Sequence, residues 1–278
     1  MRVGYQGEEL SYSHQAAESL FAGADLIGLE SFPMSFKALA AGEIERLVVP
    51  IENSSTGSVL AVLDRLLPGR VQIVAEHLVE VRHSLLGLPG AGLGSIRQVL
   101  SHPEALAQAE TVIAERGWYP RPTHDTAGAV REVAELADPA LAALAPEAAA
   151  GRFGLEVLQR DVIDQEHNTT RFVVVAPSPQ PVPDDADKTS IAFTTLHRPG
   201  ALALVLTDLG LRGANLTRIE SRPSEAAWRY RFFVDLLHPP GETGRQAIFD
   251  PLPTTIADLH ILGTYRAATH EGSAPDGG

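Results

Sequence analysis

Prolines at positions 177, 179, 181 and 183 divide the chain, and this division limits its possible folds more than any other feature. They follow an unbroken apolar run from Phe172 to Val175, which is typical of a strand buried on both faces. The next segment is acidic as far as Asp187, so we expect a semi-extended spacer rather than a packed element. The sequence therefore predicts a first domain over residues 1–176, a linker over 177–187 and a second domain over 188–267. Residues 268–278, ending in Pro-Asp-Gly-Gly, are predicted to be a disordered tail.

The composition suits a protein of two domains without a membrane-spanning part. The chain has 278 residues, 44% of them hydrophobic, and no stretch approaches the roughly 18 apolar residues of a membrane span. A strand pattern follows Met1 directly, without the segments of a signal peptide. The absence of cysteine excludes disulfides, thiolate zinc sites and a cysteine nucleophile. We therefore expect a cytoplasmic protein that has no membrane partner.

Charge is distributed unevenly along the chain. Residues 1–187 hold 13 Lys and Arg against 26 Asp and Glu, a net charge of −13, whereas residues 188–270 hold 9 against 7, a net charge of +2. The acidic first part argues against nucleic acid as a partner, because nucleic acids bind to basic surfaces. It also gives an anionic ligand no long-range attraction, so local hydrogen-bond donors would have to hold such a ligand.

Strand and helix patterns alternate through the first domain. The helices begin after capping residues such as Ser13, and one helix carries its apolar positions from Ala105 to Ile113. This alternation predicts mainly parallel sheets with helices on both faces. We expect an α/β fold of two lobes, residues 1–78 with 163–176 and residues 79–162, like that of periplasmic binding proteins, with a ligand cleft between the lobes. The expected strands are Arg2–Tyr5, Leu26–Leu29, Leu47–Ile51, Val99–Ser101, Tyr119–Pro122, Leu141–Ala145, Val157–Val162 and Phe172–Val175.

Polar clusters recur where a strand gives way to the start of a helix. Helix N-termini present unpaired N–H groups and a partial positive charge, so several of them in one cleft would suit a small molecule with carboxylates. The alternative is that each cluster is an ordinary helix cap, since Ser, Asp and Asn favour that position. The clusters are Ser11–Ser13, Asn53–Ser58, Ser101–Glu104 and Asp125–Thr126.

The second domain has the pattern of a βαββαβ unit. Its strands are expected at Thr189–Leu196, Leu216–Ser221, Trp228–Leu236 and His260–Tyr265. The first helix begins at Pro199, and we expect Pro251 and Pro253 to interrupt the second helix and keep it short.

Four motifs in the first domain together resemble the prephenate dehydratase family. The second domain resembles the amino-acid-binding ACT domain that follows the dehydratase in that family, through Arg198-Pro-Gly-Ala-Leu202 and Ile219-Glu-Ser-Arg-Pro223. The family's Gly-Pro-x-Gly-Thr-Phe-Ser loop differs here, because Glu8 and Leu10 replace the Pro and the second Gly. The four dehydratase-like motifs are Val49-Pro-Ile-Glu-Asn-Ser-Ser-Thr-Gly57, Ser101-His-Pro-Glu-Ala-Leu106, Asp125-Thr-Ala127 and Asn168-Thr-Thr-Arg-Phe172.

The resemblance implies decarboxylation and dehydration of prephenate to phenylpyruvate, with Thr170 as the hydrogen donor to the departing hydroxyl. This chemistry requires no metal and no cofactor, and the sequence lacks His and carboxylate residues at the spacing of metal ligands. Arg171 would either pair with a substrate carboxylate or brace the loop. The residues predicted to bind substrate are Ser13, Asn53, Ser54, Ser55, His102, Thr126, Arg171 and Phe172.

The resemblance also implies inhibition by L-phenylalanine and assembly as a homodimer or homotetramer. The effector residues would be Gly200, Ala201, Leu202, Asn215, Glu220, Ser221, Arg222 and Pro223. Three other functions stay open: an arogenate dehydratase, a non-catalytic small-molecule binding protein, and an ACT-containing transcription regulator.

Overall fold

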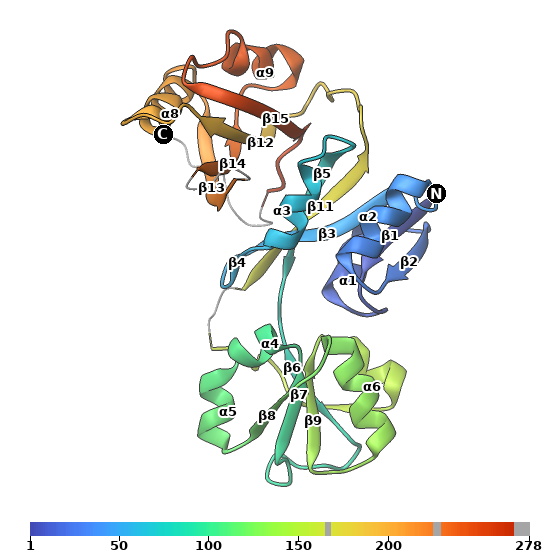
Figure 1. Cartoon of the computed structure of the whole chain (residues 1–278). Coiled ribbons are helices and arrows are strands. Elements are labelled where there is room, and N and C mark those ends of the chain that lie inside the picture. The colour runs from blue at the N-terminus through green and yellow to red at the C-terminus, as the bar shows by residue number, and fades with distance from the viewer. Residues whose placement is uncertain (165–167, 225–228, 270–278) are drawn as a thin grey trace.

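The computed structural model describes residues 1–164, 168–224 and 229–269, and these residues form three sheets (Figure 1). Two sheets belong to the two lobes of the first domain, and the third belongs to the C-terminal domain. The chain crosses from the first lobe to the second between Glu80 and Ser84, and it returns between Gln159 and Thr169. Within these ranges no helix is both long enough and apolar enough to cross a membrane.

The first lobe contains a sheet in the order β2-β1-β3-β11-β5, with β4 paired to β3. Strands β2, β1, β3 and β5 run in one direction, as the alternation predicts, whereas β11 runs the opposite way between β3 and β5. β11 is antiparallel because it enters this sheet from the second lobe rather than after a helix of the first lobe. The elements are β1 (Arg2–Gln6), α1 (Tyr12–Leu20), β2 (Asp25–Leu29), α2 (Phe32–Ala41), β3 (Arg46–Asn53), β4 (Gly57–Ser58), α3 (Leu60–Leu66), β5 (Val71–Glu80) and β11 (Thr169–Pro177).

The second lobe repeats this plan in a sheet of order β10-β6-β9-β7-β8. β6 enters from the first lobe and is antiparallel to both of its neighbours, while β7, β8 and β9 are parallel. Each lobe therefore contains one inserted strand that joins it to the other lobe. The elements are β6 (Ser84–Gly87), β7 (Gln98–Ser101), α4 (Pro103–Ala107), α5 (Glu110–Arg116), β8 (Tyr119–Pro122), α6 (Thr126–Leu136), β9 (Leu141–Ala145), α7 (Ala149–Phe153) and β10 (Glu156–Gln159).

Two predictions about helices of the first domain are wrong in detail. Ser11 caps α1, since its Oγ accepts a hydrogen bond from the backbone N–H of His14 at 3.3 Å, whereas Ser13 lies in the first turn. The helix predicted to include Ala105 and Ile113 is two short helices, α4 and α5, which meet at Gln108 and Ala109.

The C-terminal domain is a βαββαβ unit, as predicted, with a sheet in the order β13-β14-β12-β15. The prediction for its second helix is wrong, because α9 ends at Phe249 and both prolines lie beyond it. Trp228, which was predicted to start the third strand, lies outside the described residues. The elements are β12 (Lys188–Thr195), α8 (Ala201–Leu211), β13 (Asn215–Pro223), β14 (Tyr230–Leu237), α9 (Gly241–Phe249) and β15 (Ile256–Tyr265).

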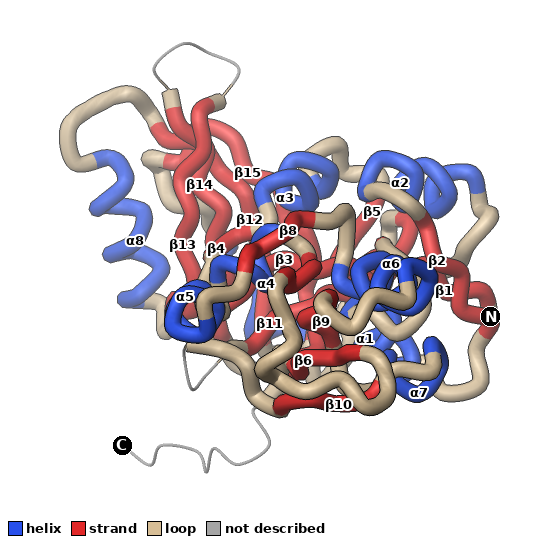
Figure 2. The backbone as a smooth tube through the Cα atoms, turned by 90° about the horizontal axis from the view of Figure 1, so that it is seen from below, coloured by secondary structure: helices blue, strands red, loops and turns tan. Residues whose placement is uncertain are grey.

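The two faces of the C-terminal sheet have different partners. One face packs with α8 and α9 around Val205, Leu209 and Ile248. The other face joins the core of the first lobe, because Phe233 and Tyr265 belong to the same apolar cluster as Leu47 and Val49. Figure 2 shows α8 on the side of this sheet that faces away from β3 and β11. The first lobe and the C-terminal domain therefore share one hydrophobic core.

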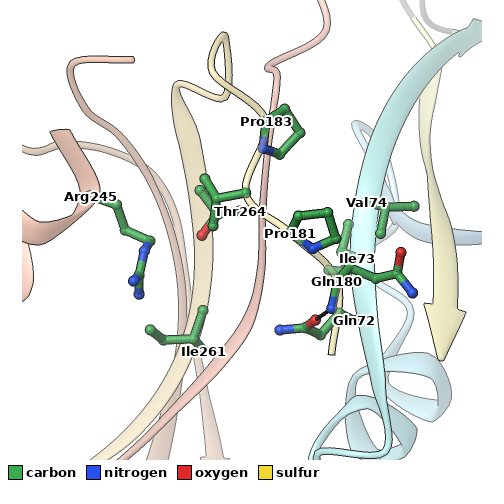
Figure 3. A pocket seen from close by; sticks show the side chains of 10 residues that line it. Gln72, Ile73, Val74, Gln180, Pro181, Pro183, Arg245, Ile261 and Thr264 are labelled. Carbon is green, nitrogen blue, oxygen red and sulfur yellow. Dashed lines mark hydrogen bonds between the residues drawn. The ribbon is translucent and has the colours of Figure 1, made fainter. Parts of the chain in front are cut away.

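The linker is packed between the two domains, in contrast to the predicted spacer. Ala186 is fully buried, and the backbone N–H of Gln180 donates to the Gln72 side chain at 2.7 Å. Figure 3 shows Pro181 and Pro183 between β5 and β15 at a cavity of about 370 Å³. The predicted tail is also anchored at its start, since the backbone N–H of Ala268 donates to Glu76 at 2.9 Å. The rest of that prediction, from residue 270 onward, lies outside the described residues.

Candidate active site

Thr170 and Asn53 lie directly opposite each other on the neighbouring strands β11 and β3. The side-chain amide of Asn53 donates two hydrogen bonds, one to Thr170 Oγ1 at 2.9 Å and one to Asn168 Oδ1 at 2.7 Å. Its own Oδ1 accepts from the backbone N–H groups of Ser55 at 2.9 Å and Thr56 at 3.1 Å. These backbone donors fix which end of the Asn53 amide is oxygen and which is nitrogen.

The fixed orientation of Asn53 determines what the Thr170 hydroxyl does. Because Thr170 Oγ1 accepts a hydrogen bond from an N–H, its own hydrogen is left to donate. Among the described residues we find no acceptor for that hydrogen, and Thr170 lines a cavity between the lobes. The strand pair therefore presents an O–H donor to whatever occupies this cavity.

This cavity, which we call the cleft cavity, has a volume of about 480 Å³ and lies where several helices begin. The N-termini of α1, α2 and α6 reach it, capped by the side chains of Ser11, Ser31 and Asp125. All four predicted polar clusters contribute residues here, together with Ser31–Pro33, which the sequence analysis did not assign to the site. The lining residues are Gln6, Gly7, Ser11, Tyr12, Ser13, Glu30, Ser31, Phe32, Pro33, Pro50, Asn53, Thr56, Val59, Val81, His83, His102, Glu104, Ala105, Gln108, His124, Asp125, Thr126, Thr170 and Phe172.

The charges around the cleft cavity are unusual for a site that holds an anion. The described residues that line it include the carboxylates of Glu30, Glu104 and Asp125 but no Lys or Arg. Positive potential must therefore come from helix N-termini, and neutral N–H and O–H groups must donate the hydrogen bonds.

A second set of hydrogen bonds joins the two lobes close to Thr170, from Asn168 through Gln108 to His83. Gln108 Oε1 accepts from Asn168 Nδ2 at 2.8 Å and pairs with His83 Nε2 at 3.1 Å. Asn168 must donate to Gln108, because its own Oδ1 already accepts from Asn53. Gln108 therefore uses its oxygen within this set and leaves its NH₂ group for the cleft cavity.

Burial keeps the histidine of this set neutral. Desolvation lowers the pKa of His83 to about 4, opposed by its hydrogen bond to Gln108. Its other ring nitrogen lies 3.2 Å from the hydroxyl of Tyr12, which donates to the carbonyl of Arg82 at 2.6 Å. Burial raises the pKa of Tyr12 above its usual value, so this hydroxyl stays protonated.

The sequence analysis did not assign Gln108, Asn168, His83 or Tyr12 to the site. Asn168 stands in the Asn-Thr-Thr-Arg-Phe motif, and Gln108 is a polar residue inside an apolar helical pattern. Tyr12 stood in the sequence only as the middle residue of the Ser11–Ser13 cluster, and His83 carried no signal. Their contact depends on the folding of one lobe against the other.

The predicted substrate-binding residues fall into two groups. Ser13, Asn53, His102, Thr126 and Phe172 line the cleft cavity together with Thr170. Ser54 and Ser55 do not line it, because the turn after β3 directs them elsewhere. Ser54 Oγ accepts from the backbone N–H of Thr169 at 3.0 Å, and the backbone N–H of Ser55 holds Asn53.

Arg171 points away from the cleft cavity, on the opposite face of β11 from Thr170. Its guanidinium pairs with Glu76 at 3.0 Å, with Glu52 at 3.0 Å and with Asp235 of the C-terminal domain. Burial alone would lower the pKa of Arg171, but the negative charges of Asp235 and the two glutamates outweigh it and raise that pKa. This geometry corresponds to the bracing role and not to a contact with substrate.

The predicted effector residues lie in two segments of the C-terminal domain. Gly200, at φ +76°, caps α8, which begins with Ala201 and Leu202. Asn215, Glu220, Ser221, Arg222 and Pro223 follow one another along β13, the edge strand of the sheet. Arg222 already pairs with Asp64 of α3 at 3.0 Å.

No group of three or more His, Asp or Glu residues in the described part of the chain is arranged to hold a metal ion. The site therefore consists of hydroxyl, amide and backbone donors around a cavity between two lobes.

Comparison with known proteins agrees with this arrangement. The prephenate dehydratase family model matches residues 3–180. An Arabidopsis thaliana protein named arogenate dehydratase/prephenate dehydratase 2, chloroplastic, is 36% identical over 97% of this chain and 74% of its own length.

Two solved structures share the whole fold. A prephenate dehydratase from Arthrobacter aurescens in complex with L-Phe has a TM-score of 0.86 at 28% identity, covering 96% of this chain and 90% of that one. GqqA, described as a novel type of quorum quenching acylase, has a TM-score of 0.84 at 33% identity, covering 96% of this chain and 98% of that one. The chain therefore belongs to the prephenate dehydratase family, whose reaction is that of a carbon–oxygen lyase.

Proposed function

We propose that prephenate binds in the cleft cavity and that the Thr170 hydroxyl donates a hydrogen bond to the hydroxyl that leaves its ring. The observation that carries this proposal is the hydrogen bond from Asn53 to Thr170 Oγ1, at 2.9 Å. It turns the Thr170 hydroxyl into a directed donor. In a dry cavity such a preorganised donor stabilises the charge that develops on the departing oxygen.

The reaction needs few functional groups from the protein. The bond to the ring carboxylate breaks and releases CO₂, and its electron pair moves into the ring and expels the hydroxyl. The hydroxyl takes up one proton and leaves as water, and the ring becomes aromatic. Because aromatisation drives the reaction, positioning and a hydrogen-bond donor suffice.

The two carboxylates of prephenate would be held without a Lys or Arg side chain. We assign them to the N-termini of α1, α2 and α6, to the NH₂ group of Gln108 and to the hydroxyls of Ser13 and Thr126. Phe172 supplies apolar contact to the ring. His102 lines the cleft cavity beside Glu104 and completes the proposed set.

Arogenate is a second candidate substrate, and the charges of the cleft cavity favour it. Arogenate carries an ammonium group where prephenate carries a keto oxygen. The carboxylates of Glu30 and Glu104, with no neighbouring Lys or Arg among the described lining residues, offer partners for that group. A single comparison of kcat/KM on the two substrates decides between them.

The experiment uses the full chain after exhaustive treatment with a metal chelator. Formation of phenylpyruvate from prephenate, or of phenylalanine from arogenate, supports the proposal. Full activity after chelation is expected because the proposed reaction uses no metal. Absence of both products would overturn it. Amide hydrolysis belongs in the same series because one relative is described as an acylase. Among the described residues, the cleft-cavity hydroxyl that contacts a histidine side chain is the phenol of Tyr12, 3.2 Å from His83. The hydroxyls of Ser11 and Thr170 accept from the backbone of His14 and from the side chain of Asn53, so neither is paired with a histidine ring as an activated nucleophile would require.

We further propose that L-phenylalanine binds the C-terminal domain of this chain and inhibits it, within a homodimer or homotetramer. The support is the Arthrobacter relative in complex with L-Phe, the helix start at Gly200 and the edge strand β13. Ile219 and Tyr230 are apolar, exposed and near that edge, as expected for a surface that meets a second copy. The cytoplasm remains the predicted compartment, and cell fractionation tests it.

A further inference from the structure

Strands β3 and β11 carry two different side-chain pairs at neighbouring positions, one on each face. On the face toward the cleft cavity, Asn53 is opposite Thr170. On the rear face, Glu52 is opposite Arg171, and the guanidinium of Arg171 bonds to Glu52 through its Nε at 3.1 Å. The residues proposed for chemistry are thus adjacent in sequence to the residues of a buried ion network.

The rear network extends into the C-terminal domain through Asp235 on β14. This carboxylate pairs with Arg171, with Arg218 at 3.2 Å and with the hydroxyl of Ser190 at 2.6 Å. Asp235 is 1% exposed, so its charge is well shielded from solvent. Burial alone would raise the pKa of Asp235, but Arg171 and Arg218 outweigh it and lower that pKa.

The pairing of β11 with β3 is irregular at this level, whereas its pairing with β5 continues without a shift from Thr170 to Phe172. Between Arg171 and Phe172 the register with β3 shifts, so that Arg171 faces Glu52 and Phe172 faces Pro50. A proline has no N–H to donate to a neighbouring strand, and a bulge changes the direction of the side chains beside it. Besides the pairing with β5, side-chain contacts on both faces therefore hold Thr170 in line with Asn53.

We propose that Asp235 of the C-terminal domain is a positioning residue for Thr170, acting through Arg171. Asp235 holds the guanidinium of Arg171 against the rear of the bulge, and the bulge then sets the place of the Thr170 hydroxyl on the other face. This inference rests on the proposed role of Thr170. It gives the C-terminal domain a part in catalysis that does not require an effector.

The same network connects the proposed effector residues to Thr170, so a change at β13 would be transmitted to the cleft cavity. Arg218 lies on β13, between the proposed effector residues Asn215 and Glu220, and it pairs with Asp235. A ligand that moves β13 would move Arg218, then Asp235 and then Arg171. Phenylalanine would inhibit only to the extent that it binds the displaced arrangement more tightly.

The test is the variant Asp235→Asn, which keeps the size of the side chain and removes its charge. Because a small misplacement of a catalytic group has a large effect on rate, we expect kcat to fall about tenfold while KM changes less than about twofold. Asp64→Asn is the matched control, since Asp64 also pairs with an arginine of the C-terminal domain but lies on α3, away from β11. This control should keep kcat within about twofold of the original.

A double-mutant cycle separates positioning from a general loss of structure. In the Thr170→Ala background the hydroxyl is absent, so Asp235→Asn should lower the remaining kcat less than about twofold. Equal losses in both backgrounds, or equal losses in Asp235→Asn and Asp64→Asn, would overturn the proposal. Glu52→Gln provides a second variant of the same network at a partly exposed position, and the same nonadditivity with Thr170→Ala is expected.

Hydrogen–deuterium exchange adds a readout that does not depend on the reaction. Peptides covering residues 168–176 should exchange faster in Asp235→Asn than in Asp64→Asn, at conditions where both variants are folded. Unchanged exchange would contradict the proposal even if the proposed reaction were wrong. The rate of the unaltered chain on prephenate and arogenate tests the reaction separately.

Discussion

At the scale of single residues, the side chains of the Asn-Thr-Thr-Arg-Phe motif have different functions on the two faces of one strand. Thr170 and Phe172 face the cleft cavity, while Arg171 between them faces the C-terminal domain. Successive side chains along a strand point to opposite faces, so once Thr170 faces the cleft cavity, Arg171 must face the other way. The sequence alone left the role of Arg171 open, because the partners of Arg171 come from β3, β5 and β14, which are far apart in the chain.

Replacing Thr170 by alanine should lower kcat by roughly 10² to 10⁴ with little change in substrate affinity, since the lost group acts on the leaving oxygen. Thr170→Ser keeps the hydroxyl and should retain much of the activity. Steady-state rates of phenylpyruvate formation measure both variants. A Thr170→Ala protein as fast as the unaltered chain would remove Thr170 from the mechanism.

Stability should fall in acid because of His83. Its pKa of about 4 in the folded protein lies below its ordinary value near 6.5, so the unfolded chain binds the extra proton first. The contribution of neutral His83 to the free energy of unfolding is complete above about pH 6.5 and is lost as the pH falls toward 4. We expect His83→Gln to flatten the decrease of Tm over this interval.

Thermal melts across that range, with His124→Gln as a control at an exposed histidine, provide the measurement. A decrease of Tm with the same slope in His83→Gln and in the unaltered chain would contradict the assignment.

At the scale of elements, the loop between β1 and α1 joins the lobes where its sequence departs from the family pattern. Glu8 pairs with Arg131 at 2.6 Å, and Glu9 pairs with Arg152, so both acids reach the second lobe. Leu10 packs against the core of the second lobe and has φ +68° in place of the family's glycine. Leu10 thus adopts a left-handed backbone conformation, and the departing residues make contacts between the lobes.

Removing both charges in Glu8→Gln with Glu9→Gln should raise KM by about thirtyfold at most and leave kcat unchanged, because two exposed ion pairs of about 1 kcal/mol or less each amount to about 2 kcal/mol at most. The contact between the loop and the second lobe becomes weaker, whereas Thr170 is unaffected. Initial rates at low and high salt measure the effect. Salt weakens these ion pairs, so it should raise the KM of the unaltered chain toward that of the variant. A variant with unchanged KM would show that the contacts of this loop with the second lobe do not contribute to substrate binding.

The sequence predicted the elements of each lobe better than their connections. The sequence pattern placed β2 and β9 closely, because their apolar residues are nearly contiguous. The break between α4 and α5 was missed, since Gln108 is held by Asn168 and His83, which no local pattern reveals. The inserted strand β11 was identified, but its antiparallel direction follows from the return of the chain between lobes.

At the scale of the whole molecule, regulation should require a correctly formed start of α8. We expect L-phenylalanine at millimolar levels to inhibit the unaltered chain and to bind far more weakly to Gly200→Val. Part of the expected loss of phenylalanine binding in Gly200→Val comes from backbone strain, because a non-glycine residue at positive φ destabilises the fold by roughly 1 to 2 kcal/mol. Gly117→Val, at φ +68° in the second lobe, is the matched control for that strain.

Titration of phenylalanine while following both rate and oligomer size tests this prediction. The control variant should respond to phenylalanine as the unaltered chain does. An unaltered chain that neither binds phenylalanine nor changes its rate would contradict the regulatory proposal and leave the catalytic one in place.

The common core of the first lobe and the C-terminal domain has a consequence for recombination and truncation. The proline-rich linker is the obvious place to cut the gene, yet a chain ending there would lose Phe233 and Tyr265 from this core and leave Arg171 without Asp235. Gly263 of β15 lies so close to Ile73 that an added Cβ would come within 2.1 Å of the Ile73 carbonyl oxygen. The part that can be transplanted is instead the second lobe, a continuous stretch from Ser84 to Gln159. A chimera of two relatives should therefore fold when the chains are joined at the two crossings between the lobes, and it should not fold when they are joined at the linker.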